Sequence, residues 1–210
     1  SKLQQNTLSN TGTLEEQQQD ANMMRALDFA DLNIDDSKSG LLGQGAFGFV
    51  RKGTWKGIPV AVKMLHAASN VSPKVITEFK HELGVLTQLH HPSLVTLIGA
   101  CVEPPNLCLV MEQMNQGSLY SHLHDHGRVL SGFEIKYLAL EMLYGLQYLH
   151  ANKIMHRDLK SLNILMFGQA PSASAPVTTL HAKIADFGLS KTLHHVSFTQ
   201  SANRGTSNWM

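Results

Sequence analysis

The most informative part of the chain is the segment His-Arg-Asp-Leu-Lys-Ser-Leu-Asn at residues 156–163, which is followed later by Asp-Phe-Gly. Asp158 is suited to accept or orient the proton of an attacking hydroxyl, and Lys160 can neutralise a phosphoryl group in transfer. Asn163 and Asp186 offer oxygen ligands to Mg²⁺, a hard cation that keeps water and substrate phosphate in its shell. Any one of these residues alone is more often a cap or a turn residue, but the four in this order predict phosphoryl-transfer chemistry.

A glycine-rich segment lies upstream and reads Gly43-Gln44-Gly45-Ala46-Phe47-Gly48. Its three glycines allow a hairpin to approach phosphate groups at distances that a Cβ would block. A glycine-rich turn is also a common structural device in hairpins, so this segment alone is weak support for a nucleotide site. A dinucleotide-binding site is disfavoured, because a strand rather than a helix follows the glycines.

Lys63 lies in an apolar strand segment, where desolvation of an unpaired ammonium would be costly. Such a lysine needs anions, which nucleotide phosphates and a carboxylate from the following helix could supply. Glu82 is the better candidate for that carboxylate, because it precedes Leu83 and Leu86 on the inward-facing stretch. Glu78, one turn earlier, is the runner-up, and a surface lysine whose head reaches solvent is the alternative to both.

The elements that must position these residues begin at Leu41, where short β-rich stretches are broken by glycine and predict an antiparallel sheet. The predicted strands cover residues 49–54, 60–65, 94–102 and 107–111. One helix interrupts them, with Ser72 as its N-cap, Pro73 at its first position and apolar residues at helical spacing as far as Leu86.

After Gly117 the pattern becomes helical, and residues 132–150 predict a buried helix. Its apolar face comprises Ile135, Leu138, Met142, Leu146 and Leu149. Residues 169–179 carry few bulky side chains and predict a mobile loop between two short strands. The result is a small β lobe and a mainly helical lobe, which join near residues 112–117.

The first 30 residues are rich in Gln, Asn, Ser and Thr and predict a polar linker. A capping box at Thr13-Leu14-Glu15-Glu16 would start a short helix through Ala26. We therefore divide the chain into a linker at residues 1–30, an N-terminal lobe at 31–113 and a partial C-terminal lobe at 114–210.

With 17 basic and 16 acidic side chains, the chain has no charge pattern typical of a nucleic-acid or membrane surface. We expect no nucleic-acid partner and no membrane segment within the chain. Cys101 and Cys108 lie in apolar surroundings without zinc spacing, which predicts reduced core thiols and a cytoplasmic location. The alternating His122, His124 and His126 are interpreted as exposed polar positions rather than as metal ligands.

Taken together, these motifs resemble a eukaryotic protein kinase domain over residues 34–210. Leu159-Lys160-Ser161 and the final segment 205–210 are similar to serine/threonine kinases. Together with Gly53-Thr54-Trp55-Lys56-Gly57, they resemble the tyrosine-kinase-like group that includes Raf and the mixed-lineage kinases. The resemblance implies ATP and Mg²⁺ as cofactors and transfer of the γ-phosphate to Ser/Thr hydroxyls of protein substrates in signalling, with dual specificity known in this group.

The resemblance also implies an α+β, bilobal fold, with a small five-stranded antiparallel lobe carrying one helix and an incomplete, mainly helical C-terminal lobe. Asp158, Lys160, Asn163, Lys63 and Glu82 would be the catalytic set, and Asn163 and Asp186 the magnesium ligands. The nucleotide would be bound by Leu42, Gly43, Gln44, Gly45, Ala46, Phe47, Gly48, Val50, Ala61, Lys63, Met111, Glu112, Met114, Leu165 and Asp186.

Within that set, the backbone of Glu112, Gln113 and Met114 would form an adenine-binding hinge, with Met111 guarding a back pocket and Leu165 as the floor. A stacked column that accompanies the active state in this family would comprise Leu86, Leu97, His156 and Phe187. Thr206 would contact Lys160. Residues 189–210 would be the activation segment, in which phosphorylation of Ser197, Thr199, Ser201 or Thr206, with Thr199 or Ser201 preferred, orders the segment through Arg157.

The chain departs from the family pattern by ending before the Ala-Pro-Glu motif and the helices that follow it. We expect exposed apolar surface on the helical lobe, and weak or no phosphate transfer by this polypeptide alone. We expect its parent, with flanking regulatory domains, to be active. The alternative is a pseudokinase-like or truncated nucleotide-binding scaffold without catalysis.

Overall fold

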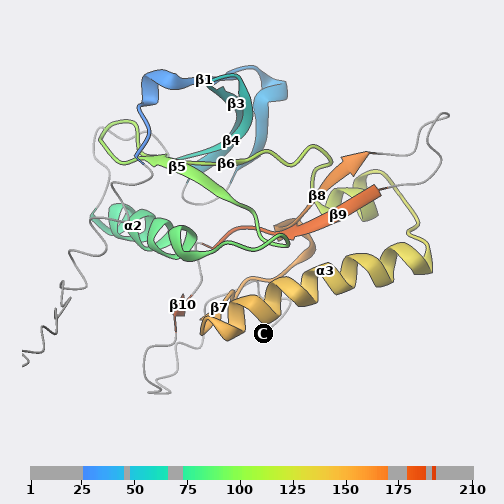
Figure 1. Ribbon diagram of the computed structural model, residues 1–210. Helices are drawn as coiled ribbons and strands as arrows, with labels where there is room; N and C mark the ends of the chain where they lie inside the picture. Colours follow the sequence, from blue (N-terminus) through green and yellow to red (C-terminus); the bar gives the residue numbers. More distant parts are fainter. Residues whose placement is uncertain (1–25, 45–47, 66–72, 170–178, 188–190, 193–210) are drawn as a thin grey trace, which may run out of the picture.

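The computed structural model describes residues 26–44, 48–65, 73–169, 179–187 and 191–192. Figure 1 shows a curved sheet at the top, helix α2 below it, helix α3 lower down and the β8–β9 hairpin above α3 on the right. The α+β class and the division into a β lobe and a lower, partly helical lobe agree with the prediction.

The upper sheet is antiparallel throughout and contains six strands in the described residues, in the order β1-β3-β4-β6-β5, with β2 also paired to β3. The prediction of five strands therefore missed one short strand, β1, beside β3. The strands are β1 (Leu32–Ile34), β2 (Leu41–Gln44), β3 (Gly48–Trp55), β4 (Ile58–Leu65), β5 (Leu97–Cys101) and β6 (Cys108–Glu112). Lys56 and Gly57 connect β3 to β4 with φ values of 49° and 82°, as a tight hairpin turn requires.

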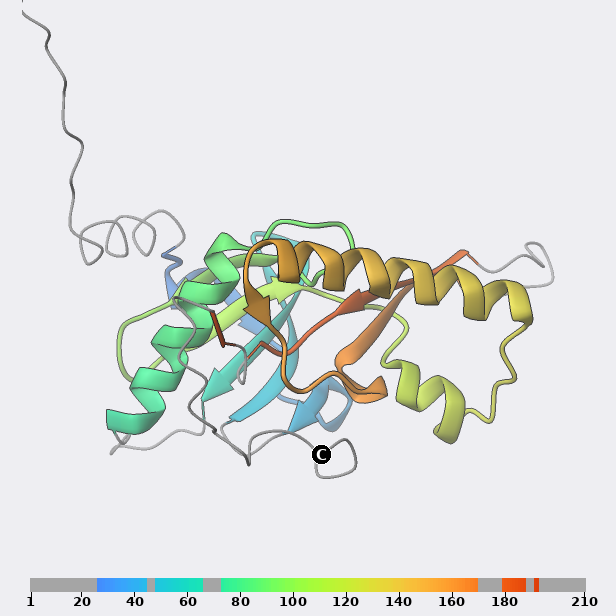
Figure 2. The same ribbon diagram turned by 90° about the horizontal axis from the view of Figure 1, so that it is seen from below.

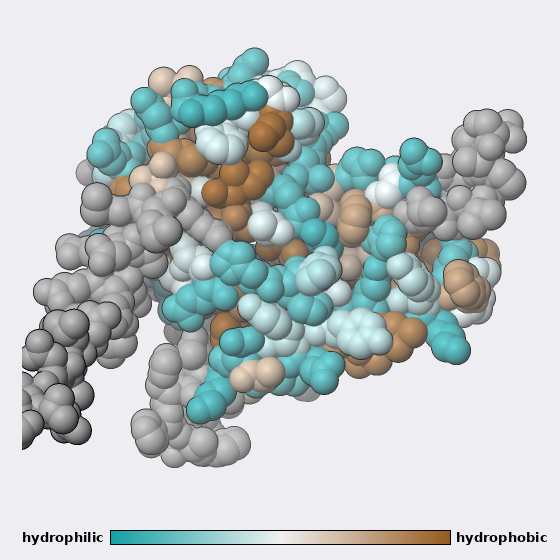
Figure 3. All heavy atoms as spheres, in the orientation of Figure 1, coloured by the Kyte–Doolittle hydropathy of each residue, from teal (hydrophilic) through white to brown (hydrophobic). Residues whose placement is uncertain are grey.

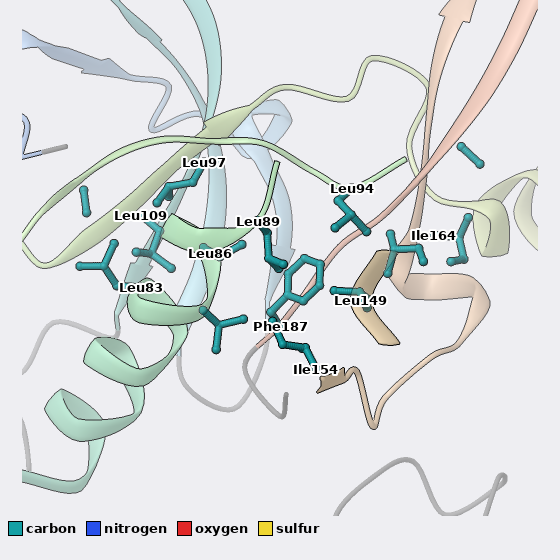
Figure 4. Packing of buried hydrophobic residues seen from close by; sticks show 14 of the residues in the cluster. Leu83, Leu86, Leu89, Leu94, Leu97, Leu109, Leu149, Ile154, Ile164 and Phe187 are labelled. Atoms are coloured by element: carbon teal, nitrogen blue, oxygen red, sulfur yellow. The ribbon is translucent and has the colours of Figure 1, made fainter. Parts of the chain in front are cut away.

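Helix α2 (Pro73–Gln88) begins at the proline predicted for its first turn, whereas Ser72 lies outside the described residues. Its buried side chains Phe79, Leu83 and Leu86, with Leu89 directly after its end, belong to the main hydrophobic cluster. Figure 4 shows this cluster continuing from α2 through Leu94 and Leu97 to Phe187 and Ile154. One core therefore extends from the upper sheet into the lower lobe.

The lower lobe contains α3 (Gly132–Ala151), which begins at a capping box between Ser131 and Glu134. Beside it lie the paired strands β8 (Ile164–Gln169) and β9 (Thr179–Ile184), as Figure 2 shows from below. The predicted loop between them lies largely outside the described residues. The remaining elements are η1 (Phe29–Asp31), η2 (Lys38–Gly40), the π-type turn η3 (Ser121–Asp125), β7 (Ile154–Met155), η4 (Ser161–Asn163) and β10 (Lys191–Thr192).

Helix α3 is buried on one side only. Leu138 and Leu149 are buried as predicted, but Ile135 is 55% exposed, which contradicts its assignment to a buried face. The described residues that pack on α3 reach the side of Leu138, Gly145 and Leu149. Apolar side chains elsewhere on the helix are exposed, including Phe133, Leu143 and Tyr144, and Figure 3 shows brown atoms at the surface along α3.

The segment Ser93–Val95 is hydrogen-bonded to β9. The N–H of Ile184 donates to the Ser93 carbonyl at 2.9 Å, and the N–H of Val95 donates to the Ile184 carbonyl at 2.9 Å. Helix α3 approaches the same place at Gly145, where an added Cβ would lie 3.0 Å from Ile184 Cδ1 and 3.1 Å from the Ser93 oxygen. Three segments distant in sequence thus meet at one point.

Residues 26–31 lie against the upper sheet and lead into its strand β1. The N–H of Leu27 donates to the Ala100 carbonyl at 2.9 Å, and Ala26 makes a parallel bridge to Ala100. The Leu27 and Phe29 side chains cover a second cluster, which comprises Val60, Val62, Cys101, Cys108 and Val110. Residues 26–30 are therefore not linker, and no helix continues through Ala26.

Cys101 and Cys108 face each other across β5 and β6, and both are buried free thiols, as predicted. In the described part of the chain, no helix combines the length and apolarity needed to cross a membrane.

Candidate active site

Lys63 is held between two carboxylates that come from different elements. Its Nζ atom on β4 donates to Glu82 of α2 at 2.7 and 2.9 Å and to Asp186, just after β9, at 3.2 Å. The contact is with Glu82 rather than with Glu78. Burial alone would lower the pKa of Lys63, but the charges and hydrogen bonds of Glu82 and Asp186 outweigh it and hold that pKa above its usual value. The lysine is therefore a fixed cation.

Asp158, Lys160 and Asn163 form a second polar cluster in the segment before β8. Lys160 Nζ donates to Asp158 Oδ2 at 2.6 Å, and Asn163 Nδ2 donates to the Asp158 carbonyl at 2.8 Å and to Oδ2 at 3.1 Å. Asp158 and Asn163 are both buried. Because the Nδ2 group is turned toward Asp158, the Asn163 amide has a defined orientation, with its oxygen directed away from that carboxylate.

His156 connects this segment to the residues around Asp186. Its Nε2–H donates to the Ala185 carbonyl at 2.9 Å, while Nδ1 accepts from the N–H of Asp158 at 3.3 Å. These two bonds require the neutral ring protonated on Nε2. Burial lowers the pKa of His156, although the hydrogen bond to Ala185 and the nearby charges of Asp186 and Asp158 act in the opposite direction.

The predicted column of four side chains is assembled. His156 contacts Phe187 edge-on, with ring centroids 5.2 Å apart, and Phe187 shares the main cluster with Leu86 and Leu97. All four side chains are at most 4% exposed. The column thus spans β5, α2 and the segments on either side of the candidate site.

The predicted adenine site lies where β6 leaves the sheet. Met111 and Leu165 pack against a small cluster that contains Met114, Val95 and Ala185. Ala61 on β4 pairs with Met111 in the sheet. Among the described residues, the backbone N–H and carbonyl of Met114 have no hydrogen-bond partner, so both are available to a ligand at this position.

Glu112 of the predicted hinge has side-chain partners that sequence reasoning missed. Its Oε1 accepts the N–H of Thr96 at 2.8 Å and the Lys183 Nζ at 2.6 Å. Lys183 precedes the Asp-Phe-Gly segment and also lies 5.2 Å from the Phe167 ring centroid. A lysine in the apolar β9 segment, where it needs an anion, was a signal available in the sequence.

The glycine-rich segment has its predicted hairpin context, because β2 pairs with β3 through Gly43↔Val50 and Gln44↔Phe49. At Gly48 an added Cβ would collide with the Met64 carbonyl oxygen. Leu42 is 42% exposed, so its side chain is accessible. The predicted contacts of Gly45, Ala46 and Phe47 lie outside the described residues, as do Ser197, Thr199, Ser201 and Thr206.

One histidine assignment is wrong. His122 is only 5% exposed, and its Nε2 lies 2.8 Å from the Gln116 carbonyl oxygen, whereas the sequence pattern placed it at an exposed polar position. It lies in the π-type turn η3, whose residue spacing differs from that of an α-helix. The polar character of this side chain therefore did not predict its exposure.

The donor set fits a magnesium ion. Asn163 is oriented by its donor bonds to Asp158, and the carboxylate of Asp186 is about half exposed, with Oδ1 turned to Lys63. Carboxylate and amide oxygens are ligands that this hard cation accepts.

Comparison with known proteins agrees with this geometry. The chain matches the family model described as the protein kinase domain over residues 37–210. A protein described as a probable serine/threonine-protein kinase of Dictyostelium discoideum is 38% identical over 208 residues, which cover 98% of this chain and 21% of that protein. The probable serine/threonine-protein kinase drkA of the same organism is 37% identical over 185 residues, covering 87% of this chain and 27% of the relative.

Serine/threonine-protein kinase VIK of Arabidopsis thaliana is 36% identical over 160 residues, which cover 75% of this chain and 34% of that protein. The chain thus spans between about a fifth and a third of the length of these three relatives.

Proposed function

The chain belongs to the protein kinase family, as a kinase domain of the serine/threonine type, and on this premise we propose that it transfers the γ-phosphate of ATP to Ser or Thr hydroxyls of protein substrates in signalling. The observation that carries the proposal is the simultaneous presence of the Lys63–Glu82 ion pair and the assembled column of Leu86, Leu97, His156 and Phe187. Protein kinases need the lysine–glutamate ion pair for phosphoryl transfer, and the packing of the Asp-Phe-Gly phenylalanine distinguishes their active from their inactive states.

The roles follow from the chemistry of each group. Asp158, held by Asn163 and Lys160, orients the acceptor hydroxyl and receives its proton. Lys63 binds the α/β-phosphates, because its raised pKa keeps it cationic. Asn163 and Asp186 would hold Mg²⁺, which when bound neutralises the charge on the β- and γ-phosphate oxygens. The Met114 backbone and the Leu165 side chain bind and orient the adenine.

Regulation and location extend the proposal. Phosphorylation of Thr199 or Ser201 would order the activation segment through Arg157, since a phosphate and a guanidinium form strong paired hydrogen bonds. A cytoplasmic location is supported by the two buried free thiols Cys101 and Cys108. The substrates are proteins, and flanking domains of the parent would select them.

The decisive experiment is phosphate transfer from labelled ATP to a Ser/Thr peptide library by the full-length protein, wild type against Asp158→Asn. We expect loss of at least about 100-fold in kcat, the range by which a positioned general base contributes, and little change with Asp125→Asn, a matched change at an exposed aspartate. Equal activity of wild type and Asp158→Asn would refute the role of Asp158. Bound ATP without transfer in the wild type would favour the scaffold alternative.

The 210-residue polypeptide should itself transfer phosphate weakly or not at all, because exposed apolar side chains on α3, such as Phe133 and Leu143, favour self-association. Robust transfer by the purified 210-residue chain that depends on Asp158 would contradict this part of the proposal.

A further inference from the structure

The backbone that leaves the hinge lies against β8 as if it were an additional strand. The N–H of Gln116 donates to the Met166 carbonyl at 3.1 Å, and the N–H of Met166 donates to the Gly117 carbonyl at 2.7 Å. One residue further on, Ser118 makes an antiparallel bridge with Leu165. The hinge exit is thereby hydrogen-bonded to the same strand that carries the predicted adenine floor.

Asn115 continues this ladder with its side chain. Its Nδ2 donates to the Gly168 carbonyl at 3.1 Å, and its Oδ1 accepts the N–H of Gly168 at 3.1 Å. A primary amide presents a donor and an acceptor in the same way as a peptide group, so it can pair with both backbone groups of one residue. The Gln116 Nε2 also donates to the Gly168 carbonyl at 3.1 Å. Because Asn115 is exposed, burial does not by itself account for this pairing.

His122 fixes the same turn from the other side. Its ring is 5% exposed, and Nε2 lies 2.8 Å from the Gln116 carbonyl oxygen, which can only accept. The Nε2 atom therefore carries the proton. Among the described residues, the buried Nδ1 atom has no hydrogen-bond partner. The ring thus makes one directed bond in this part of the chain, and that bond is to the hinge exit.

These contacts fix the position of the Met114 backbone relative to the Leu165 side chain, the two groups that would lie against an adenine ring. Met114 lies directly before Asn115, and its side chain packs in one cluster with Leu165. A change in the ladder between residues 115–118 and β8 moves the Met114 backbone relative to Leu165. We propose that Asn115 and His122 are positioning residues for adenine, which hold the hinge backbone and the floor in register; this inference rests on the proposed function as an ATP-dependent kinase.

A purely structural role would have a different kinetic consequence. If Asn115 and His122 only stabilised the fold, their loss would reduce the amount of active protein, and so the apparent kcat, without changing KM for ATP. If they position the adenine site, binding of the base weakens while the phosphate-binding residues, such as Lys63, stay in place.

The experiment uses the full-length protein with Asn115→Ala and His122→Phe, and Asn152→Ala as the matched control. Asn152 makes a comparable side-chain bond to the Tyr148 carbonyl at the end of α3, away from the hinge. KM for ATP, kcat and the inhibition constants of two probes are measured at matched folded fractions. Adenosine reports on the site of the base and ribose without the phosphates, and inorganic tripolyphosphate with Mg²⁺ reports on the phosphate site alone.

We expect KM for ATP and the inhibition constant of adenosine to rise together by about tenfold in both variants, which corresponds to about 1.4 kcal/mol. The tripolyphosphate constant and kcat should stay within about twofold of wild type, as should every constant of Asn152→Ala. Asn115→Asp keeps the Oδ1 acceptor but sets a carboxylate against the Gly168 carbonyl, so it should resemble Asn115→Ala.

Unchanged adenosine binding in Asn115→Ala and His122→Phe overturns the positioning role while leaving the proposed kinase function intact. A parallel loss of adenosine and tripolyphosphate binding also overturns it, because that pattern indicates general loosening of the fold. A wild-type protein that binds neither probe and transfers no phosphate instead refutes the proposed function, and the inference falls with it.

Discussion

Glu112 Oε1 lies 2.6 Å from Lys183 Nζ, and this ion pair connects the end of β6 to β9. The same oxygen accepts the N–H of Thr96. The Lys183 side chain is 11% exposed and that of Glu112 28% exposed, so the pair is mostly shielded from water. It therefore links the hinge of the candidate adenine site to the strand that leads into the Asp-Phe-Gly segment.

Replacing Lys183 by Met should destabilise the protein by about 1–3 kcal/mol, because the Glu112 carboxylate is then left partly buried without its cation. Urea unfolding measures the change, with Lys136→Met on the exposed side of α3 as the control. A double-mutant cycle with Glu112→Gln should give a coupling of about 1 kcal/mol. Additive effects of the two changes would show that the ion pair contributes nothing.

The two glutamates of α2 should differ sharply in their effect on nucleotide binding. Glu82→Gln removes the charge that orients Lys63 and should weaken ATP binding by about tenfold or more, since roughly 1.5–3 kcal/mol is expected for a hydrogen bond to a charged group. Glu78→Gln is the matched control, because Lys63 makes no contact with Glu78. Equal weakening by both variants would contradict the pairing seen here.

The raised pKa of Lys63 sets the pH range in which its ion pair contributes to stability. Because its pKa is raised in the folded protein, the contribution is complete below the pKa of an unfolded lysine, about 10.4. It is lost only as the pH rises through the folded value. The difference in unfolding free energy between wild type and Lys63→Met should therefore be constant from pH 7 to about 9, as urea titrations can show.

For His156, we expect folding stability to decrease as the pH falls into the acid range. Its pKa is lowered on folding, so the unfolded chain takes up the proton first as the pH falls below about 6.5. The contribution of the neutral His156 ring to the free energy of unfolding is complete above that pH and declines below it. His156→Phe keeps an aromatic ring beside Phe187 but cannot titrate. Its unfolding free energy, measured without nucleotide or Mg²⁺, should fall less steeply between pH 7 and 5 than that of wild type; an identical slope would exclude His156 as a source.

Much of the candidate site was predictable, because the sequence context of individual residues allowed them few alternative roles. An apolar strand leaves Lys63 in need of anions, and the helical spacing of α2 selects Glu82. The burial of His122 was not predictable, because it depends on the π-type turn Ser121–Asp125 and on a contact with the Gln116 carbonyl oxygen, which the local sequence does not indicate. Residues 26–30 were assigned to the linker for another reason: their packing depends on tertiary contacts with the sheet, which local composition does not encode.

Phe187 should be the most sensitive aromatic side chain of the column. It is 1% exposed, and Phe187→Ala should cost about 3–5 kcal/mol through the cavity it leaves. Phe133→Ala is the matched control at a position that is 78% exposed, where a change within about 0.5 kcal/mol is expected. Thermal or urea unfolding of both variants provides the comparison, and similar losses in the two would argue against the assembled column.

The contact between Ser93–Val95, Ile184 and Gly145 has a consequence for motion. These segments are joined by backbone hydrogen bonds and by a helix that leaves little room for a side chain at Gly145, so we expect them to move together. If the sheet closes over a nucleotide, as the proposed function implies, we expect the displacement to be smallest at this point and to grow toward the glycine-rich hairpin. The crossing would then be the fixed point about which the upper sheet rotates.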